Sequence, residues 1–152
     1  LGRIARGLHP GVLEDLGLSA AIKRFALEYG RVYGVRTYVK LDEIDRSSTI
    51  SEATSLTLYR IAQEALLNAA RHGHAKDVSI IGTRGHNEVR MVVEDDGCGF
   101  DVDATLSGDQ RRGMGLRSMG ERLALLGGEL TIESTPGRGT ALFARMPEGV
   151  IA

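Results

Sequence analysis

The segment from Ser51 to His72 has a regular helical pattern, and this helix limits the folds that the rest of the chain can form. Ser51 followed by Glu52 is a typical helix start, and Gly73 is a typical stop. At 100° per residue, most of its apolar side chains fall on one side, which must be buried against another layer, here a sheet. The apolar side holds Leu56, Tyr59, Ala62, Leu66, Leu67 and Ala70.

The remaining pattern supplies that sheet and two more helices. Residues 17–33 and 113–126 have helical spacing and end at glycines, and residues 1–8 resemble the tail of a helix. We expect strands at 35–41, 77–83, 88–94, 129–134 and 140–146. Because strands are grouped beside helices without strict alternation, we predict an α/β fold: a two-layer sandwich of a mixed, mostly antiparallel sheet packed on three helices. Residues 101–112 are polar and aperiodic, which predicts a mobile loop.

Composition narrows the function classes. The 152 residues suffice for one domain with an appendage, and a net charge of -1 provides no field that attracts nucleic acid or anionic lipid. Cys98 is the single cysteine, so a disulfide framework is excluded and a reducing, cytoplasmic setting is expected. There is no membrane-spanning apolar run and no signal segment. The start at Leu1, within a helical pattern, suggests a piece of a longer protein, and a membrane-anchored parent is compatible with this.

The side of the 51–72 helix opposite the apolar one carries a polar set. Glu64, Asn68, Arg71 and His72 fall there, with Thr57 in line. A carboxylate and a carboxamide one turn apart suit a hard divalent cation, and neighbouring positive charge suits phosphate. An ordinary solvated helix face is the commoner explanation for this segment taken alone.

Three glycine-containing segments add to this set. The strand before Asp95 and Asp96 ends in an acidic pair, after which Gly97 and Gly99 let a ligand approach the backbone, so that an Asp there can bind an amine such as that of adenine. Arg111, Arg112, Gly113 and Gly115 stand at a helix start, where free N–H groups bind anions. In the turn 137–140, the Thr140 hydroxyl can add a contact to a base. Alone, each segment is equally explained as an acidic turn, a hinge or a hairpin.

Together and in this order, the four segments resemble the N, G1, G2 and G3 boxes of the GHKL ATPases, the superfamily of gyrase, the heat-shock ninety chaperones, mismatch-repair MutL proteins and histidine kinases. The match covers residues 51–147. The resemblance implies a Bergerat ATP-binding fold, in which ATP lies between two long helices and the sheet, under a mobile lid at about 101–112.

The resemblance also implies roles for individual residues. Asn68 is similar to the Mg²⁺ ligand, Asp95 to the residue that reads the adenine amine, and Thr140 to its water-assisted partner. Gly97 and Gly99 resemble the turn that gives the base room, and Gly113 and Gly115 the phosphate cradle. Glu64 is either a catalytic base, a support for the metal site or polar scaffolding. The resemblance implies a catalytic pair, Glu64 and Asn68. It also implies a nucleotide-binding set, which consists of Asn68, Arg71, His72, Asp95, Gly97, Gly99, Arg112, Gly113, Gly115, Leu116 and Thr140.

Three segments are similar to the histidine kinases that serve LuxR-type response regulators: residues 60–72, 113–128 and 8–18. The last of these implies that residues 1–17 are the end of a dimerisation and phosphotransfer helix with a linker, and that residues 18–152 are the catalytic domain. His9 is followed by Pro10, not by an acidic residue that would help it act as a base, so we interpret it as structural. The acceptor histidine then lies upstream, outside this chain.

The implied function is to bind Mg²⁺-ATP and transfer its γ-phosphoryl group to a histidine of the dimerisation domain, with at most slow ATP hydrolysis by this chain alone. The implied partners are that domain, a LuxR-type response regulator and a second copy of the parent, without direct nucleic-acid or membrane contact. Two alternatives stay open. An anti-sigma-factor serine kinase would not need residues 1–17, and a non-catalytic nucleotide-binding module would not need the intact set around Asn68 and Asp95.

Overall fold

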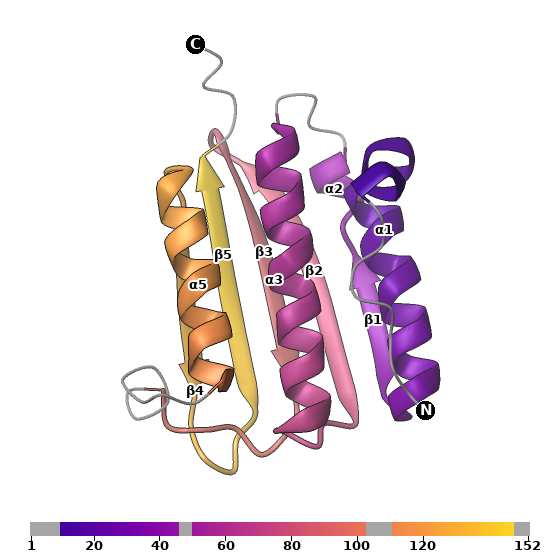
Figure 1. Cartoon of the computed structure of the whole chain (residues 1–152), viewed down its shortest axis with the longest axis vertical. Coiled ribbons are helices and arrows are strands. Elements are labelled where there is room, and N and C mark those ends of the chain that lie inside the picture. The colour runs from indigo at the N-terminus through magenta and orange to yellow at the C-terminus, as the bar shows by residue number, and fades with distance from the viewer. Residues whose placement is uncertain (1–9, 46–49, 103–110, 148–152) are drawn as a thin grey trace.

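The structure, a computed structural model, describes residues 10–45, 50–102 and 111–147 (Figure 1). Its elements follow one another in the order α1 Pro10–Tyr33, β1 Arg36–Lys40, α2 Asp42–Asp45, α3 Glu52–Arg71, β2 Asp77–Gly85, β3 Glu88–Asp95, α5 Arg111–Leu125, β4 Glu129–Ser134 and β5 Thr140–Pro147. The expected helix tail at 1–8, His9 and most of the expected lid lie outside the described residues.

The strands form one five-stranded mixed sheet in the order β1-β2-β3-β5-β4. β1 and β2 are parallel, and the other three pairs are antiparallel. The register aligns Val78 with Asp95, Asp95 with Thr140, and Thr140 with Ser134. Residues far apart in the chain therefore meet in one row, at the end of the sheet where β3 stops and β5 starts.

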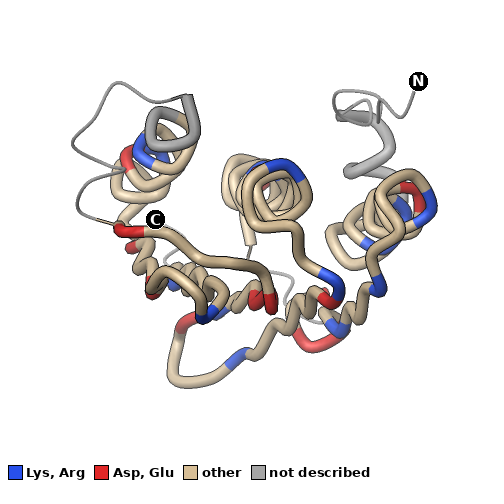
Figure 2. Tube along the Cα trace, turned by 90° about the horizontal axis from the view of Figure 1, so that it is seen from below, with Lys and Arg blue, Asp and Glu red and all other residues tan. Residues whose placement is uncertain are grey.

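The helices α1, α3 and α5 stand side by side over one face of the sheet, which Figure 2 shows end-on. The space between the two layers is filled by fully buried side chains from both, among them Ile22, Tyr29, Leu58, Leu66, Ile80, Met91 and Leu123. The expected α/β sandwich of a mixed sheet on three helices is confirmed.

The central position of α3 corrects one detail of the helical-wheel prediction. Thr57 was expected on the polar side, but its side chain is only 8 % exposed, and its hydroxyl donates to the Ala53 carbonyl at 2.9 Å. Thr54 and Gln63 are buried as well, whereas Leu56 and Leu67 are only partly buried. A helix between two other helices is covered on its flanks, so more than one stripe is removed from water.

Local signals explain where the elements begin and end. The Ser51 hydroxyl accepts the Thr54 N–H at 3.1 Å and so caps α3, as its position predicts. Gly34 ends α1 with a φ of 69°, and Gly17 interrupts α1 with a φ of 85°. The β2–β3 turn places His86 and Asn87 at φ values of 49° and 63°, as in a two-residue hairpin of the favoured twist.

Several boundaries differ from expectation. α1 begins at Pro10, seven residues before the expected start at residue 17, and is interrupted at Gly17. The short helix α2 was not predicted, because four residues are too few to show a period. α5 begins at Arg111, two residues earlier than expected, so Gly113 lies in its first turn. In the part of the chain that the structure describes, no helix combines the length and the apolar character needed to cross a bilayer.

Candidate functional site

A small pocket lies where α3, α5 and the ends of β3 and β5 meet. Three polar side chains, Asn68, Asp95 and Thr140, line it among apolar ones. Ala65, Ala69, Gly73, Phe100, Leu116 and Leu142 complete its walls. Few polar groups in an apolar setting are typical of small-molecule sites, because the apolar walls provide affinity and the polar groups provide orientation.

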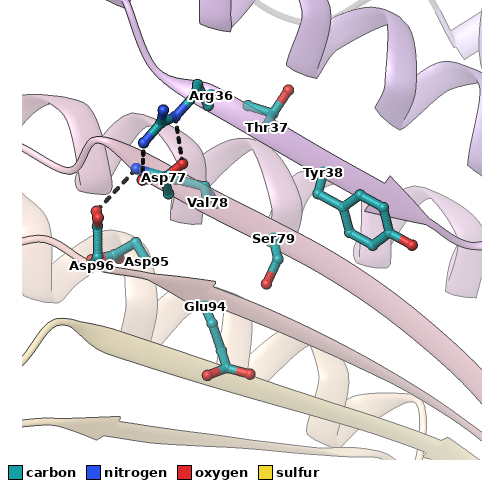
Figure 3. Close-up of a pocket in the computed structure, with 9 residues that line it drawn as sticks. All are labelled: Arg36, Thr37, Tyr38, Asp77, Val78, Ser79, Glu94, Asp95 and Asp96. Carbon is teal, nitrogen blue, oxygen red and sulfur yellow. Dashed lines mark hydrogen bonds and ion pairs between the residues drawn. The ribbon is translucent and has the colours of Figure 1, made fainter.

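Asp95 and Asp96 have separate tasks in this structure. Asp95 Oδ1 accepts the Gly97 N–H at 2.8 Å, and its carboxylate lines the pocket. Asp96 Oδ1 accepts the N–H groups of Lys76 at 2.8 Å and Asp77 at 3.0 Å, and Figure 3 shows its side chain turned toward β2. The backbone N–H groups of Asp77 and Lys76 lower the pKa of Asp96. Of the two, Asp95 and not Asp96 is therefore among the residues that line the pocket.

The turn after Asp95 requires glycine at two positions. A Cβ on Gly97 would lie 2.6 Å from the Gly73 carbonyl oxygen and 2.9 Å from Asp95 Oδ1. Gly99 has a φ of 65°, and a Cβ there would lie 2.2 Å from the Thr135 carbonyl oxygen. Between them, Cys98 N–H donates to the Gly73 carbonyl at 2.7 Å. The backbone of this turn packs directly against the backbone of Gly73 and Thr135, which keeps Asp95 in a fixed position.

Ser134 also helps to fix this turn, although the sequence did not indicate it as a site residue. Its hydroxyl lies 2.8 Å from Thr140 Oγ1 and accepts the Phe100 N–H at 2.9 Å. It also lies 3.0 Å from the Gly139 carbonyl oxygen. The signal that could have revealed it is the register of the 129–134 and 140–146 hairpin, which pairs Ser134 with Thr140.

Glu64 and Asn68 lie one turn apart on α3, next to the start of α5. Burial raises the pKa of Glu64, while the positive charge of Arg71 and the nearby Asn68 amide oppose the rise. A Cβ on Gly115 would lie 2.6 Å from Glu64 Oε2, so the carboxylate contacts α5. The amide nitrogen of Asn68 is buried without a hydrogen-bond partner. Such a group indicates a missing ligand.

This arrangement fits the expected magnesium ion. The two ends of an amide are interchangeable in placement, so the Asn68 oxygen can occupy the position of its unpartnered nitrogen. Mg²⁺ in nucleotide sites takes one or two protein oxygens and fills its shell with water and phosphate oxygens. Among the described residues, no group of three or more His, Cys, Asp or Glu side chains could hold a metal. Asn68, with Glu64 beside it, is therefore the donor set that this part of the described chain offers.

The other expected residues take different places around the pocket. Arg71 and His72 are exposed at the end of α3, and the His72 N–H caps the helix by donating to the Asn68 carbonyl at 2.9 Å. Leu116 lines the pocket and is 2 % exposed. Gly113 lies in the first turn of α5, where N–H groups lack helical partners. The Arg112 side chain is not among those the structure describes.

The pocket is nearly closed in this structure. Its cavity is about 10 Å³, about the space that one water needs. A purine ring cannot enter unless the walls separate. Binding of a nucleotide therefore requires a rearrangement of the elements that line the pocket.

A larger hollow of about 360 Å³ lies on the opposite, helix-free face of the sheet (Figure 3). Its charged groups are partly paired with each other, since Arg36 binds both oxygens of Asp77 at 2.7 and 2.8 Å. It is open to solvent and has neither Asn68 nor Thr140 in its lining. Asp95 lines both hollows, but of the two it is the smaller one that also has Asn68 and Thr140 in its lining.

Comparison with known proteins identifies the family of this chain. Residues 53–150 match the family model described as "Histidine kinase-, DNA gyrase B-, and HSP90-like ATPase". The sensor histidine kinase MctS of Rhizobium johnstonii is 38% identical over 147 residues, which are 96% of this chain and 31% of MctS. The signal transduction histidine-protein kinase/phosphatase UhpB of Salmonella typhimurium is 33% identical over 149 residues, 96% of this chain and 28% of UhpB. The chain thus spans less than a third of the length of either relative.

Solved structures share the fold. The histidine kinase domain of the blue-light activated histidine kinase EL346 from Erythrobacter litoralis superposes with a TM-score of 0.68 at 23% identity, covering 86% of this chain and 60% of that one. Full-length ShkA, solved in complex with AMPPNP, gives a TM-score of 0.71 at 19% identity, covering 90% of this chain and 30% of that one. At these identities the likeness establishes the fold.

Proposed function

This chain belongs to the family of histidine kinase-, DNA gyrase B- and HSP90-like ATPases, and from that membership we propose that it is the ATP-binding catalytic domain of a sensor histidine kinase. It binds Mg²⁺-ATP in the pocket around Asn68, Asp95 and Thr140. It then donates the γ-phosphoryl group to a histidine on another domain. The two relatives described above, which match 96% of this chain, are both named as histidine kinases, and this favours the proposal over an anti-sigma-factor serine kinase.

The observation that carries the proposal is the placement of Asp95. One carboxylate oxygen is held by the Gly97 N–H at 2.8 Å, and the pocket it lines also contains the Thr140 hydroxyl, next to it in the sheet register. A carboxylate fixed in this way accepts a hydrogen bond from the exocyclic amine of adenine. The Thr140 hydroxyl is oriented by Ser134. Through a bridging water, it provides a second polar contact for the base.

The phosphate end has a separate group of residues. Asn68, supported by Glu64, would hold the magnesium ion, which neutralises charge on the phosphates when it is bound. Gly113 and Gly115 lie at the start of α5, where the helix dipole and the first N–H groups favour anions. Arg71 and His72 add positive or polar groups at the end of α3, and Leu116 lines the pocket beside them. Arg112 completes the proposed set by its place in the sequence. The chain's contribution is to position the phosphates and balance their charge.

Glu64 supports the metal site in this proposal, and does not activate water. Its pKa is raised by burial, which gives it some character of a base, but its carboxylate is held between Asn68 and Gly115. Hydrolysis by the isolated chain is therefore slow. A comparison of Glu64→Ala with Asn68→Ala tests this: equal loss of nucleotide binding supports the metal role. Retained binding with lost turnover in Glu64→Ala alone would assign the base role to Glu64.

The rest of the signalling assembly follows from the same proposal. Residues 1–17 connect to a dimerisation domain that carries the acceptor histidine, in a homodimeric parent whose phosphoryl group passes to a LuxR-type response regulator. Similarity to sensor histidine kinases over 96% of the chain supports these partners. The proposal places this domain in the cytoplasm, where ATP is available.

The decisive experiment is a titration of the chain with ATP and Mg²⁺ by calorimetry, followed by phosphotransfer. We expect saturable binding that Asp95→Asn abolishes. Mixing the chain and radiolabelled ATP with the full-length parent, whose acceptor histidine is intact but whose own Asn68→Ala site is disabled, should label the parent. Absence of ATP binding, or binding that Asp95→Asn leaves unchanged, would overturn the proposal.

A further inference from the structure

Tyr29 carries one of two buried side-chain atoms that lack a hydrogen-bond partner among the described residues. The other is the Asn68 amide nitrogen, whose ligand has been argued above. Tyr29 is 0% exposed, so its hydroxyl has no access to bulk water. A buried hydroxyl without a partner is costly in free energy and requires an explanation. Phenylalanine would fill the same space without this cost.

The fold brings Tyr29 to the end of the sheet where Asp95 lies. Tyr29 is one turn before the end of α1, and its ring packs on that of Tyr33 with 5.3 Å between centroids. The chain then enters β1 at Arg36, which is paired with Asp77, next to the Val78–Asp95 pair. The end of α1 and the end of β3 therefore lie at the same end of the sheet (Figure 1).

Tyr29 approaches this end of the sheet from α1, which is not among the elements that line the pocket. The pocket is lined by residues of α3, α5, β3 and β5, and Tyr29 is not among them. Burial, and after it the negative charge of Asp95, raise the pKa of Tyr29. The hydroxyl therefore stays protonated, within electrostatic reach of the carboxylate. A carboxylate accepts up to about four hydrogen bonds. The Asp95 carboxylate can therefore accept hydrogen bonds from the Gly97 N–H, from a ligand and from a third donor at the same time.

We propose that Tyr29 is a positioning residue for base recognition: its hydroxyl donates, across one buried water, to the Asp95 carboxylate from the α1 side. The donor holds the carboxylate in the orientation that meets the adenine amine. It also lowers the cost of keeping that carboxylate charged within the fold. The inference rests on the proposed function, because it assigns the support of the same Asp95.

The test compares Tyr29→Phe with Tyr33→Phe, a matched loss of a hydroxyl from the adjacent ring. Affinities for ATP and for inosine triphosphate, which lacks the exocyclic amine, are measured with Mg²⁺ by competition against a fluorescent nucleotide. We expect Tyr29→Phe to weaken ATP binding about 3- to 10-fold, the range for loss of one hydrogen bond. Inosine triphosphate binding should be unchanged, and Tyr33→Phe should bind both as the unmodified chain does.

Thermal unfolding without nucleotide separates positioning from packing. Tyr29→Phe should unfold at nearly the same temperature as the unmodified chain, because loss of the water-mediated hydrogen bond to Asp95 is offset by removal of a buried polar group. Unchanged ATP affinity, an equal loss for both nucleotides, or a loss of affinity that accompanies a loss of stability would each overturn the inference. If the unmodified chain binds neither nucleotide, the proposed function itself fails, and that outcome is distinct from all three.

Discussion

Asp95 and Asp96 are neighbours in the chain, yet their carboxylates accept hydrogen bonds from different backbone segments. Asp95 holds the Gly97 N–H inside its own turn, while Asp96 holds the Lys76 and Asp77 N–H groups at the start of β2. Asp95 is the last residue of β3, and Asp96 is the first residue after it. One is therefore placed for a ligand, and the other ties the β3 end to the α3–β2 connection.

At the scale of a residue, Asp96→Asn should lower the free energy of unfolding by about 0.5–1 kcal/mol at pH 7, because a charged acceptor is replaced by a neutral one in an exposed, screened position. The N–H groups of Asp77 and Lys76 lower the pKa of Asp96 in the folded state. Its contribution is thus present above the unfolded pKa of about 3.9 and is lost as the pH falls toward the folded pKa.

Urea unfolding of the two proteins at pH 7 and in a series below pH 4 measures this. The difference between them should shrink as the pH falls. Glu94→Gln, which changes an exposed carboxylate two residues earlier, in β3, is the control and should change little. A difference that persists unchanged in acid would show that charge is not the source.

At the scale of elements, the approach of α5 to α3 decides where Glu64 lies. The Gly115 position leaves 2.6 Å between a built Cβ and Glu64 Oε2. Ordinary van der Waals contact needs a longer separation, so any side chain there must push the carboxylate away. Gly120, on the same helix, has no neighbour nearer than 3.9 Å to such an atom.

Gly115→Ala should therefore keep the fold but weaken Mg²⁺-ATP binding at least about 10-fold, an effect of about 1.4 kcal/mol, because the displaced Glu64 no longer supports Asn68. Gly120→Ala, the matched control, should leave binding unchanged and stabilise the chain by about 0.5–1 kcal/mol, since alanine favours a helix interior. Calorimetric titration and thermal unfolding of both variants provide the two measurements. Equal affinities in the two variants would argue against contact of Glu64 with the metal site.

At the scale of the whole molecule, the closed pocket makes nucleotide binding a conformational event. The cavity of about 10 Å³ lies between the α3–α5 pair and the sheet, so room for a base is obtained only when these layers shift. Ligand binding to the folded state then stabilises all of them together. The free energy of this shift is subtracted from the intrinsic affinity.

Mg²⁺-ATP at about 100 times its dissociation constant should raise the unfolding free energy by about 2.7 kcal/mol. For a chain of this size the unfolding temperature should then rise by about 5–10 °C. Differential scanning fluorimetry measures the rise, and Asp95→Asn should show none. Addition of EDTA should reduce it, because the phosphates lose the ion at Asn68. A shift that is equal in Asp95→Asn would place the nucleotide elsewhere.

Elements with a clear period and end signals could be predicted from the sequence alone. Ser51 and Gly73 bound α3 within a residue of the expected positions, and the β2–β3 turn forms at His86 and Asn87 as expected. The four-residue α2 was missed, because it is shorter than two helical turns. The burial of Thr57 was missed, because it depends on the helices at both flanks of α3 and not on α3 itself.

The sequence by itself determined the kind and order of most elements, because caps, turns and periodicity act over a few neighbouring residues. Its resemblance to the GHKL ATPases selected the candidate residues Asn68, Asp95 and Thr140. Only the tertiary structure decided that Asp96 holds β2 and that Ser134 orients Thr140. It alone placed the Tyr29 hydroxyl in the core without a partner and nearly closed the pocket. These features depend on strand register and on the distance between layers, which join residues that are far apart in the chain.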